Sequence, residues 1–479
     1  MESPPVIVWF RRDLRLADNP ALHAARESGA PVLPVFVLDE KEAFAPGGAA
    51  KWWLHQSLKS LSADLEKAGS PLILKRGRAA EIIPSLAGAL KASAVYWNRR
   101  YAPAHVESDK ALKATLTEAG YEVKSFNAAL LREPWEVETK TGGPFRVYTP
   151  FWKALSAKEP ARKALPGLRK VKGFIEAPPS DILDDWRLEP RKPDWASGFG
   201  ETWRPGETGA HAALKEFLED AAASYARDRD MPARGGTSRL SPHLSFGEIG
   251  PVQIWQATHA QIEAGGISRQ AGEKFLTEIG WRDFSYNLLF YNEGMAERPL
   301  RAEFASFPWR KDIKGLAAWK KGLTGYPIVD AGMRQLWRTG WMHNRVRMIA
   351  ASFLVKDLLI PWQEGARWFW DTLVDADAAN NSASWQWVAG CGADAAPYFR
   401  IFNPVSQAEK FDPAGDYVRE YVPELAALPS EFIHAPWRAA DAALKKAGVI
   451  LGDTYPKPVV DHAFARTRAL EAFKTIKKA

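Results

Sequence analysis

The chain has 479 residues, of which 46% are hydrophobic and 25% charged, so it suits two domains or one large domain and excludes wholesale disorder. Its single cysteine, Cys391, excludes internal disulfides and cysteine-rich metal sites, and no metal is expected. The sequence has neither an apolar run of about 18 residues nor a secretory leader, so we expect a cytoplasmic bacterial-type protein with no membrane span. The formal charge of +7 favours an anionic partner such as nucleic acid, although a mildly basic protein without one fits the charge equally well.

The first part of the chain alternates short apolar runs with segments of helical periodicity. Apolar positions recur at helical spacing in residues 52–68 and 104–118. This alternation predicts an α/β domain with a doubly wound parallel sheet of five strands, covered on both faces. No Gly-x-Gly-x-x-Gly follows the first strand, so a Rossmann dinucleotide site is not expected there. The expected strands are residues 6–10, 32–38, 72–74, 94–97 and 121–126.

A long segment rich in Pro, Lys and Trp follows, at residues 133–205. We expect it to connect an α/β domain of residues 1–132 to an all-α C-terminal domain of residues 206–479, and to contain short helices because structureless loops of this length are uncommon. From residue 207 the pattern is helical to the end, without an internal repeat. The expected helices are residues 212–225, 268–291, 328–338, 343–359 and 367–373.

The segment of residues 235–250 opens with two glycines that free the backbone. Hydroxyls, backbone amides and a guanidinium then follow at an expected helix start, a combination that can wrap a pyrophosphate. On this segment alone, a helix cap with a solvent-exposed arginine is the commoner structure. The residues concerned are Thr237, Ser238, Arg239, Leu240 and Ser241.

Two helical motifs carry mixed polar and aromatic faces. Helical geometry places Glu278, Trp281, Arg282 and Ser285 on one face, which suits a wall between a cavity and DNA. The simpler alternative is a solvent-exposed Glu–Arg pair contributing a few tenths of a kcal/mol, roughly.

A second motif follows Gly340, which predicts the end of one helix before another begins near His343. Asn344, Arg347 and Met348 then share a face, while Arg345 points aside. The alternative is an Asn and a Met buried in the core.

Residues 375–387 join two acids, a run of amides and small residues, and two tryptophans, and the pattern continues to residue 404. This composition is poorly suited to a plain core helix, because Asn, Asp and Ser favour caps and turns. It suits a buried polar cofactor whose ring system needs hydrogen bonds at its edge and aromatic neighbours. The chain's 21 tryptophans can fill a core, but such an excess also favours stacking on planar ligands or electron transfer.

These motifs resemble the photolyase/cryptochrome family over essentially the whole chain, most closely its bacterial class III photolyases. The resemblance implies a monomeric lyase, a deoxyribodipyrimidine photo-lyase, that repairs cyclobutane pyrimidine dimers in UV-damaged DNA and is nucleoid-associated when bound to it. Excited reduced FAD (FADH⁻) donates an electron to the flipped-out dimer, the ring bonds break, and the electron returns. The expected antenna pigment is 5,10-methenyltetrahydrofolate.

The resemblance also implies the residues that hold FAD. Residues 237–241 and Tyr225 bind its diphosphate and ribityl part, Asp375 pairs with Arg347, and Asn381 faces flavin N5. A neutral amide suits a protonated N5, whereas plant cryptochromes typically have an acid there. The implied cofactor residues are Tyr225, Thr237, Ser238, Arg239, Leu240, Ser241, Phe275, Glu278, Arg282, Asn344, Arg347, Asp375, Asp377 and Asn381.

Further implied roles concern electrons and the lesion. Trp385, Trp362 and Trp309 form an electron-transfer chain, and Glu278 and Asn381 are implied catalytic residues. Six-four photolyases have histidines at the positions of Asn344 and Met348, and neither side chain here can act as an acid; repair of cyclobutane dimers alone is therefore expected. The implied DNA and lesion residues are Arg229, Glu278, Trp281, Arg282, Asn344, Arg345, Met348, Gln386 and Trp387.

The N-terminal domain adds an opening motif at residues 8–22 that is similar to that of the family. Its charged side chains, Arg11, Arg12, Asp13 and Arg15, are expected to lock a turn against neighbouring strands. Residues 97–101 end a strand and form a candidate surface for the antenna pigment.

Two other functions are alternatives to the repair of dimers. A cryptochrome-type light receptor without repair activity is opposed by the two lesion-stacking tryptophans and by the lack of a long disordered tail. A flavin-free helical DNA-binding protein would be recognised by its absorption spectrum.

Overall fold

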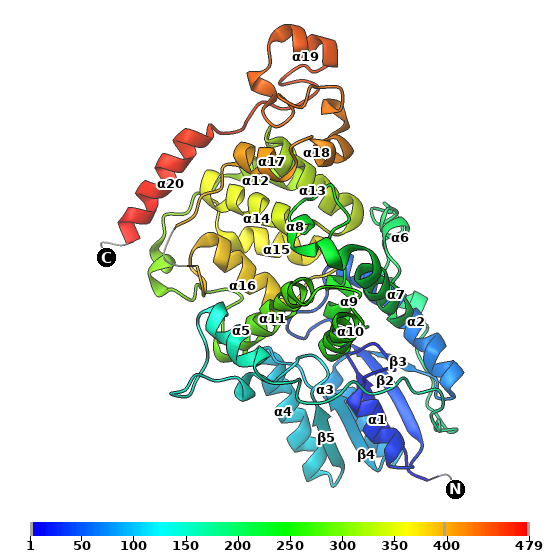
Figure 1. The fold of residues 1–479 in the computed structure, drawn as a ribbon. Coiled ribbons are helices and arrows are strands. Elements are labelled where there is room, and N and C mark those ends of the chain that lie inside the picture. The colour runs from blue at the N-terminus through cyan, green and yellow to red at the C-terminus, as the bar shows by residue number, and fades with distance from the viewer. Residues whose placement is uncertain (1–2, 396–398, 477–479) are drawn as a thin grey trace. The chain divides into compact units, whose positions relative to one another are not determined.

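The N-terminal part of the chain forms the expected parallel sheet. The computed structural model describes residues 3–395 and 399–476, so residues 396–398 of the segment that runs to Pro404 lie outside the described part. All strand pairs are parallel, in the order β3-β2-β1-β4-β5 (Figure 1). The strands are β1 (Val6–Phe10), β2 (Val32–Leu38), β3 (Ile73–Arg76), β4 (Ala94–Asn98) and β5 (Glu122–Phe126).

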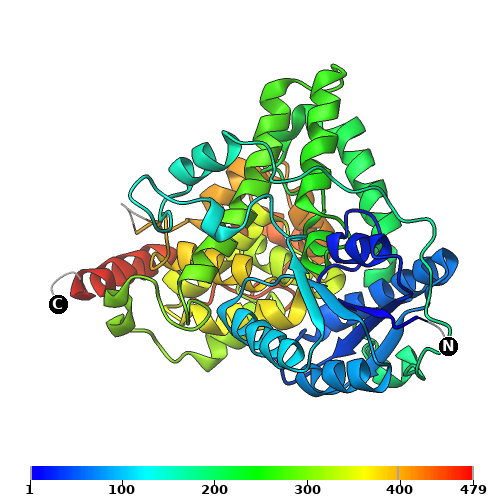
Figure 2. The same cartoon turned by 90° about the horizontal axis from the view of Figure 1, so that it is seen from below.

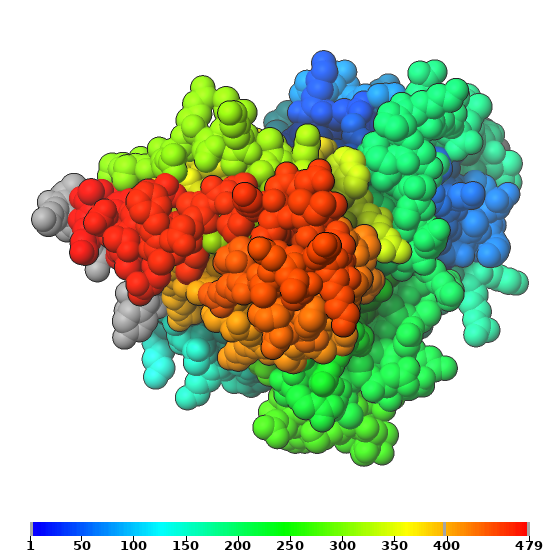
Figure 3. Space-filling view, turned by 90° about the horizontal axis from the view of Figure 1, so that it is seen from above, coloured from blue at the N-terminus to red at the C-terminus, as the bar shows by residue number. Residues whose placement is uncertain are grey.

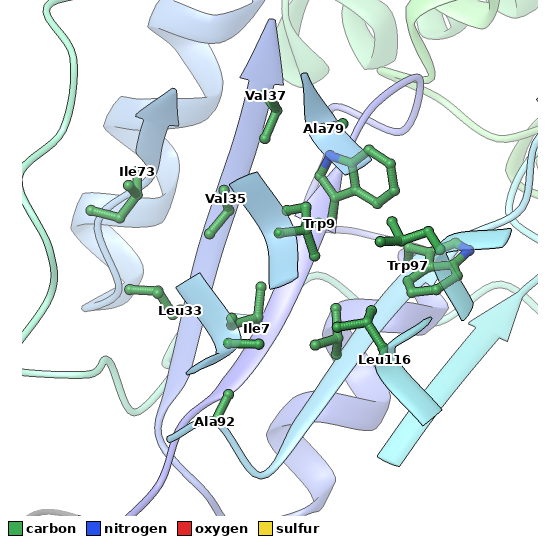
Figure 4. Packing of buried hydrophobic residues seen from close by; sticks show 14 residues of the cluster. Ile7, Trp9, Leu33, Val35, Val37, Ile73, Ala79, Ala92, Trp97 and Leu116 are labelled. Atoms are coloured by element: carbon green, nitrogen blue, oxygen red, sulfur yellow. The ribbon is translucent and has the colours of Figure 1, made fainter. Parts of the chain in front are cut away.

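Both faces of this sheet are covered, which explains why β1 and β2 are uninterrupted apolar runs. On one face Ile7, Trp9 and Trp97 pack against helices α3 (Ala79–Ala89) and α4 (Pro103–Glu118) (Figure 4). The indoles of Trp9 and Trp97 meet edge to face, with ring centroids 6.0 Å apart. Helix α1 (Pro20–Glu27) lies against the other face (Figure 2).

The expected connector contains short helices, as predicted for a segment of this length. They are η1 (Pro134–Glu136), α5 (Tyr148–Ser156), η2 (Leu183–Trp186) and α6 (Phe199–Thr202). Much of the connector packs onto the α/β part of the chain: its backbone adds to β2, where Val32 N donates to Lys172 O. This packing places it in the same compact unit as the sheet.

The chain forms two compact units. The first comprises the chain up to Ala223 with Ser238–Glu293 and Val374–Ala379, and the second comprises Ser224–Thr237, Gly294–Leu373 and the chain from Asn380. This division does not follow the expected domain limits of residues 1–132, 133–205 and 206–479, which stay a prediction. The remaining helices of the first unit are α2 (Gly48–Ala68), α7 (Glu207–Glu216), η3 (Phe217–Ala221), α9 (Ser241–Phe246), α10 (Pro251–Glu263) and α11 (Arg269–Tyr291).

The second unit is helical, and its last segments, coloured orange to red, lie at the front of Figure 3. No helix among the described residues is long and apolar enough to cross a membrane. Its helices are α8 (Tyr225–Asp228), η5 (Ala302–Ser306), α12 (Ile313–Lys321), α13 (Pro327–Thr339), α14 (Asn344–Ser352), η6 (Phe353–Asp357), α15 (Trp362–Thr372), most of α16 (Ala378–Ala389), α17 (Pro404–Phe411), α18 (Asp416–Tyr421), α19 (Asp441–Ala447) and α20 (His462–Ile476), with short turns η4 (Ala222–Ser224), η7 (Pro423–Leu425) and η8 (Pro436–Arg438).

The sequence-based view of residues 375–387 needs correction, because Ala378–Ala389 is a regular helix, α16. Alanines supply helix propensity between the amides, and tertiary packing outweighs the preference of Asn and Ser for turns. Trp385 lies against Gly365 of α15, where an added Cβ would come 2.0 Å from the indole. A helix can therefore present this polar and aromatic pattern.

Candidate functional site

In the first unit, the segment after the two glycines leads into α9, and its backbone turns sharply. Arg239 has a φ of +52°, and its guanidinium carbon lies 5.2 Å from the ring centroid of Trp203. Leu240 is buried, whereas Ser241, the first residue of α9, is exposed. The segment thus keeps its hydroxyl and guanidinium groups at the surface of the unit.

A buried polar cluster anchors α9. The Trp53 indole donates to Glu248 Oε1 at 2.9 Å, and His243 Nδ1 lies 2.5 Å from Glu248 Oε2. Ser245 Oγ donates to the carbonyl of Ala376 at 2.9 Å. These bonds fix α9 and join it to the Val374–Ala379 segment, which contains two candidate cofactor residues.

Helix α11 carries the predicted acid, indole and guanidinium stripe. The Arg282 guanidinium is buried, donates to the carbonyl of Ala129, and lies 4.9 Å from the Tyr286 ring centroid. Glu278 is half-buried and pairs with Lys274 at 3.9 Å. Phe275 packs on Phe217, with centroids 4.5 Å apart. The alternative of a simple solvent-exposed Glu–Arg pair is excluded, because Arg282 is not exposed.

Trp281 on the same helix is covered on one face by Tyr148, a residue that the sequence analysis missed. The two rings are stacked with centroids 3.7 Å apart and planes 11° apart, and Tyr148 Oη donates to the Thr277 carbonyl at 2.5 Å. Gly280 makes this packing possible, since a Cβ there would lie 2.3 Å from Trp152 of α5. Helix α5 therefore fixes the plane of the Trp281 indole.

Two carboxylates of the first unit, Asp375 and Asp377, are buried with 7% and 9% of their surface exposed. Tyr286 Oη donates to Asp377 Oδ2 at 2.5 Å, and burial raises the pKa of the Tyr286 phenol. Buried carboxylates need donors to remain ionised. Tyr286 was also missed, although its place one turn beyond Arg282 was a signal for it.

Asp283, which lies between Arg282 and Tyr286 in α11, is fully buried. Its Oδ2 accepts from the Leu131 backbone N–H at 2.8 Å, while Oδ1 has no hydrogen-bond partner among the described residues. Burial raises the pKa of the Asp283 carboxyl to about 7, and the charge of Arg282 opposes this only partly. The group ties the chain just before the connector to α11.

In the second unit, α13 ends at Gly340 with φ +67° and α14 begins next to His343, as predicted; the His343 side chain caps α14. Asn344 is exposed and Met348 half-buried, which excludes the alternative of an Asn–Met pair buried in the core. Arg345 does not simply point aside: its Nη1 lies 3.9 Å from Met348 Sδ, because a long flexible side chain can reach the neighbouring face.

Basic residues gather around this helix start. Arg345 pairs with Asp230 at 2.8 Å, and Arg229, next in the chain, lies 5.2 Å from the Tyr225 ring centroid. Burial lowers the pKa of His343 to about 4, so its ring is neutral at neutral pH. Arg347 Nε donates to the Met342 carbonyl at 2.7 Å. The segment Ser224–Thr237 and α14 thus combine three arginines in one region of this unit.

The three predicted relay tryptophans all lie in the second unit. Trp385 and Trp362 are buried, and Trp309 is half-buried, with its ring centroid 4.4 Å from that of Phe307. The Trp385 indole lies near the rings of Phe369 and Trp319, with ring centroids 5.0 and 6.2 Å away. Trp319 was not predicted, since only its position in the fold identifies it.

The end of α16 is held by buried polar bonds. Gln386 Nε2 donates to the carbonyls of Met295 and Arg298, at 2.7 and 2.9 Å, and its Oε1 accepts from Leu300 N at 2.8 Å. Lys356 Nζ donates to the Ala389 carbonyl at 2.9 Å, and burial lowers the pKa of this lysine well below its ordinary value. Gln386 therefore holds the loop before η5, and contact with DNA would require these bonds to open.

Trp387 and Asn381 of α16 are half-buried. The guanidinium carbon of Arg400 lies 5.3 Å from the Trp387 ring centroid. Asn381 Nδ2 donates to the Ala366 carbonyl at 3.1 Å, which directs its Oδ1, an acceptor, away from Ala366. An acceptor at this position fits a ligand that presents an N–H group.

The opening motif is largely structural, as predicted. Arg11 pairs with Asp109 at 2.8 Å, Asn98 Nδ2 donates to Asp13 Oδ2 at 2.6 Å, and Arg15 Nη1 donates to the Gly247 carbonyl at 2.8 Å. The prediction that residues 97–101 form a surface for the antenna pigment is wrong for the two aromatic rings of this segment, which are buried. Trp97 and Tyr101 are each only 1% exposed because they pack into the sheet core and its edge.

Residues 6–168 match the family described as DNA photolyase, and residues 275–475 match the FAD binding domain of DNA photolyase. The chain is 53% identical to a deoxyribodipyrimidine photo-lyase of Agrobacterium fabrum, over 100% of this chain and 99% of that protein. It is 39% identical to Cryptochrome-1 of Arabidopsis thaliana, over 97% of this chain and 70% of that protein. It is also similar to the crystal structure of a bacterial class III photolyase from Agrobacterium tumefaciens, with a TM-score of 0.97, 52% identity, and coverage of 100% of this chain and 99% of that one.

Proposed function

The chain belongs to the DNA photolyase/cryptochrome family, and from this premise we propose that it is a deoxyribodipyrimidine photo-lyase that repairs cyclobutane pyrimidine dimers in UV-damaged DNA. The observation that carries the proposal is the full-length match, at 53% identity, to a relative with that name. The more distant cryptochrome relatives support the family but not this activity. By the likeness to the Agrobacterium structure, we assign the chain to class III.

The chain's residues fit FAD, the cofactor expected from the match of residues 275–475. Exposed Ser241 and Arg239 supply a hydroxyl and a guanidinium for a diphosphate, and buried Asp375 and Asp377 supply acceptors for ring N–H groups. Asn381 Oδ1 is directed away from Ala366 and suits the protonated N5 of reduced flavin. When bound, reduced FAD supplies light absorption and the electron that splits the dimer.

We propose that the chain's own contribution to the lesion site is stacking and charge. Trp281, backed by Tyr148, and Trp387 stack on the flipped-out bases, and Arg229 and Arg345 contact phosphates. Met348 supplies an apolar floor beside Asn344. Neither of these two side chains is an acid near neutral pH, and splitting a cyclobutane ring needs none.

The electron route and the remaining partners are also proposals. Trp309, Trp362 and Trp385 relay electrons that reduce the flavin, and 5,10-methenyltetrahydrofolate serves as antenna. The protein acts as a monomer and associates with the nucleoid through damaged DNA. Cys391 is buried, and no cluster of metal-ligating side chains occurs among the described residues.

The test is a blue-light repair assay on an oligonucleotide with one thymine dimer and chemically reduced holoprotein. Repair returns the absorbance of the two thymines, and a dark sample is the control. Light-dependent recovery supports the proposal. Flavin-containing protein without repair would instead favour a cryptochrome-type light receptor.

A further inference from the structure

Tyr286, on α11 of the first unit, is aimed at Asp377 by two contacts. Its hydroxyl donates to Asp377 Oδ2 at 2.5 Å. Its ring is held by Arg282, whose guanidinium carbon lies 4.9 Å from the ring centroid. Arg282 itself is fixed by its bond to the Ala129 carbonyl. The phenol is therefore a rigid donor to one oxygen of a buried carboxylate.

The positive charge of Arg12, just after β1, acts on the same pair. Its guanidinium carbon lies 4.4 Å from the ring centroid of buried Phe246. Burial lowers the pKa of Arg12, and the electrostatic effects of Tyr286 and Asp377 oppose this change. The positive charge of Arg12 therefore interacts with the Tyr286–Asp377 pair.

Arg12 also differs from the other arginines of the opening motif. Arg11 and Arg15 make several hydrogen bonds each, which accounts for their structural roles. The Nη1 atom of Arg12 is buried and has no hydrogen-bond partner among the described residues. Among the described residues, Arg12 Nη1 therefore makes no bond of the kind by which Arg11 and Arg15 lock the turn.

We infer that Tyr286 is a positioning residue for Asp377, and that Tyr286 and the charge of Arg12 together set the charge which this carboxylate presents to the flavin. The inference rests on the proposed function, in which Asp377 contacts FAD. The phenol orients the carboxylate and draws charge to Oδ2, and the positive charge of the Arg12 guanidinium offsets the negative charge of Asp377. Partners of this kind, one contact removed from the ligand, tune it through the residue that touches it.

The direction in which these residues shift the midpoint potential of bound FAD follows from charge. Without the phenol or the guanidinium, Asp377 presents more uncompensated negative charge, and a negative charge beside the flavin disfavours adding electrons to it. We expect the midpoint potential of bound FAD to become more negative in Tyr286→Phe and in Arg12→Met. FAD binding should weaken about tenfold in Tyr286→Phe, from the loss of one hydrogen bond to a charged group.

The experiment is spectroelectrochemical titration of the holoprotein, with FAD affinity measured by reconstitution. The matched control is Tyr291→Phe, which removes a hydroxyl from the same helix that lies 3.4 Å from a different carboxylate, Glu138. It should leave the potential unchanged, and Arg12→Lys, which keeps the charge, should stay close to the wild type.

A wild-type potential in flavin-loaded Tyr286→Phe and Arg12→Met would overturn the inference. So would loss of folding in both variants, because a structural role would then explain the residues. A wild-type chain that takes up no FAD would contradict the proposed function instead.

Discussion

Removing the Tyr148 ring should weaken lesion binding without affecting binding of intact DNA. The ring stacks on Trp281 with centroids 3.7 Å and planes 11° apart, a geometry that contributes roughly 0.5–1.5 kcal/mol beyond buried area. In Tyr148→Ala the Trp281 indole loses this support and must be ordered when a base stacks on it. We expect a cost of about 1 kcal/mol, which is about fivefold in Kd. This is less than the roughly 1–3 kcal/mol for losing the stacking indole itself in Trp281→Ala.

The assay is fluorescence anisotropy in the dark, with labelled oligonucleotides that contain or lack a dimer. Tyr148→Phe keeps the ring and loses the hydroxyl that bonds to the Thr277 carbonyl, so its Kd should stay near the wild type. Trp135→Ala, which removes an indole that is 45% exposed, controls for loss of an aromatic side chain elsewhere. Unchanged dimer affinity in Tyr148→Ala, or equal weakening for both DNAs, would refute the reasoning.

Three further results are expected. The Asp283 carboxyl has a pKa of about 7 in the folded chain against 3.8 as reference, so the folded state binds the carboxyl proton more tightly than the unfolded state. Burial of this group therefore costs stability as the pH rises towards 7. The melting temperature of Asp283→Asn minus that of the wild type should grow from about pH 5 to about pH 8, and a constant difference would contradict this. Trp385→Phe should block photoreduction of oxidised flavin but leave repair by chemically reduced protein intact, and undiminished photoreduction would show a route that bypasses this indole. Asp375→Ala should purify with far less FAD per chain than the wild type, as measured by absorbance, and full occupancy would remove Asp375 from the cofactor site.

The sheet was predictable because its sequence signal is local. Residues 6–10 and 32–38 are continuous apolar runs, and the structure makes them β1 and β2 with the same limits. β3 and β5 begin one residue later than expected, and β3 runs two residues further, into half-buried Lys75 and exposed Arg76, which an apolar run does not mark. The end of α13 at Gly340 and the start of α14 near His343 were predictable for the same reason, because a helix end depends on the residues next to it.

Contacts between distant segments were not predictable from the motifs. Tyr148 comes from a segment with little periodicity, and its role depends on Gly280, 132 residues later by their numbers, leaving room for α5. The pairing of Tyr286 with Asp377 also joins remote parts of the chain. In α16 the local preference of Asn and Ser for turns was outweighed by packing of Trp385 on Gly365. The motifs thus indicated which residues matter, but not which neighbours hold them.

The most direct test of the central claim gives the reduced holoprotein two oligonucleotides under blue light, one with a cyclobutane dimer and one with a six-four photoproduct. Asn344 is exposed at the start of α14, and its Nδ2 lies 4.0 Å from Met348 Sδ, one turn further along. Neither side chain can donate a proton as an acid near neutral pH. The account predicts efficient repair of the cyclobutane dimer and none of the six-four photoproduct. Six-four repair would contradict the assignment of these two residues, and repair of neither lesion would identify a light receptor instead of a repair enzyme.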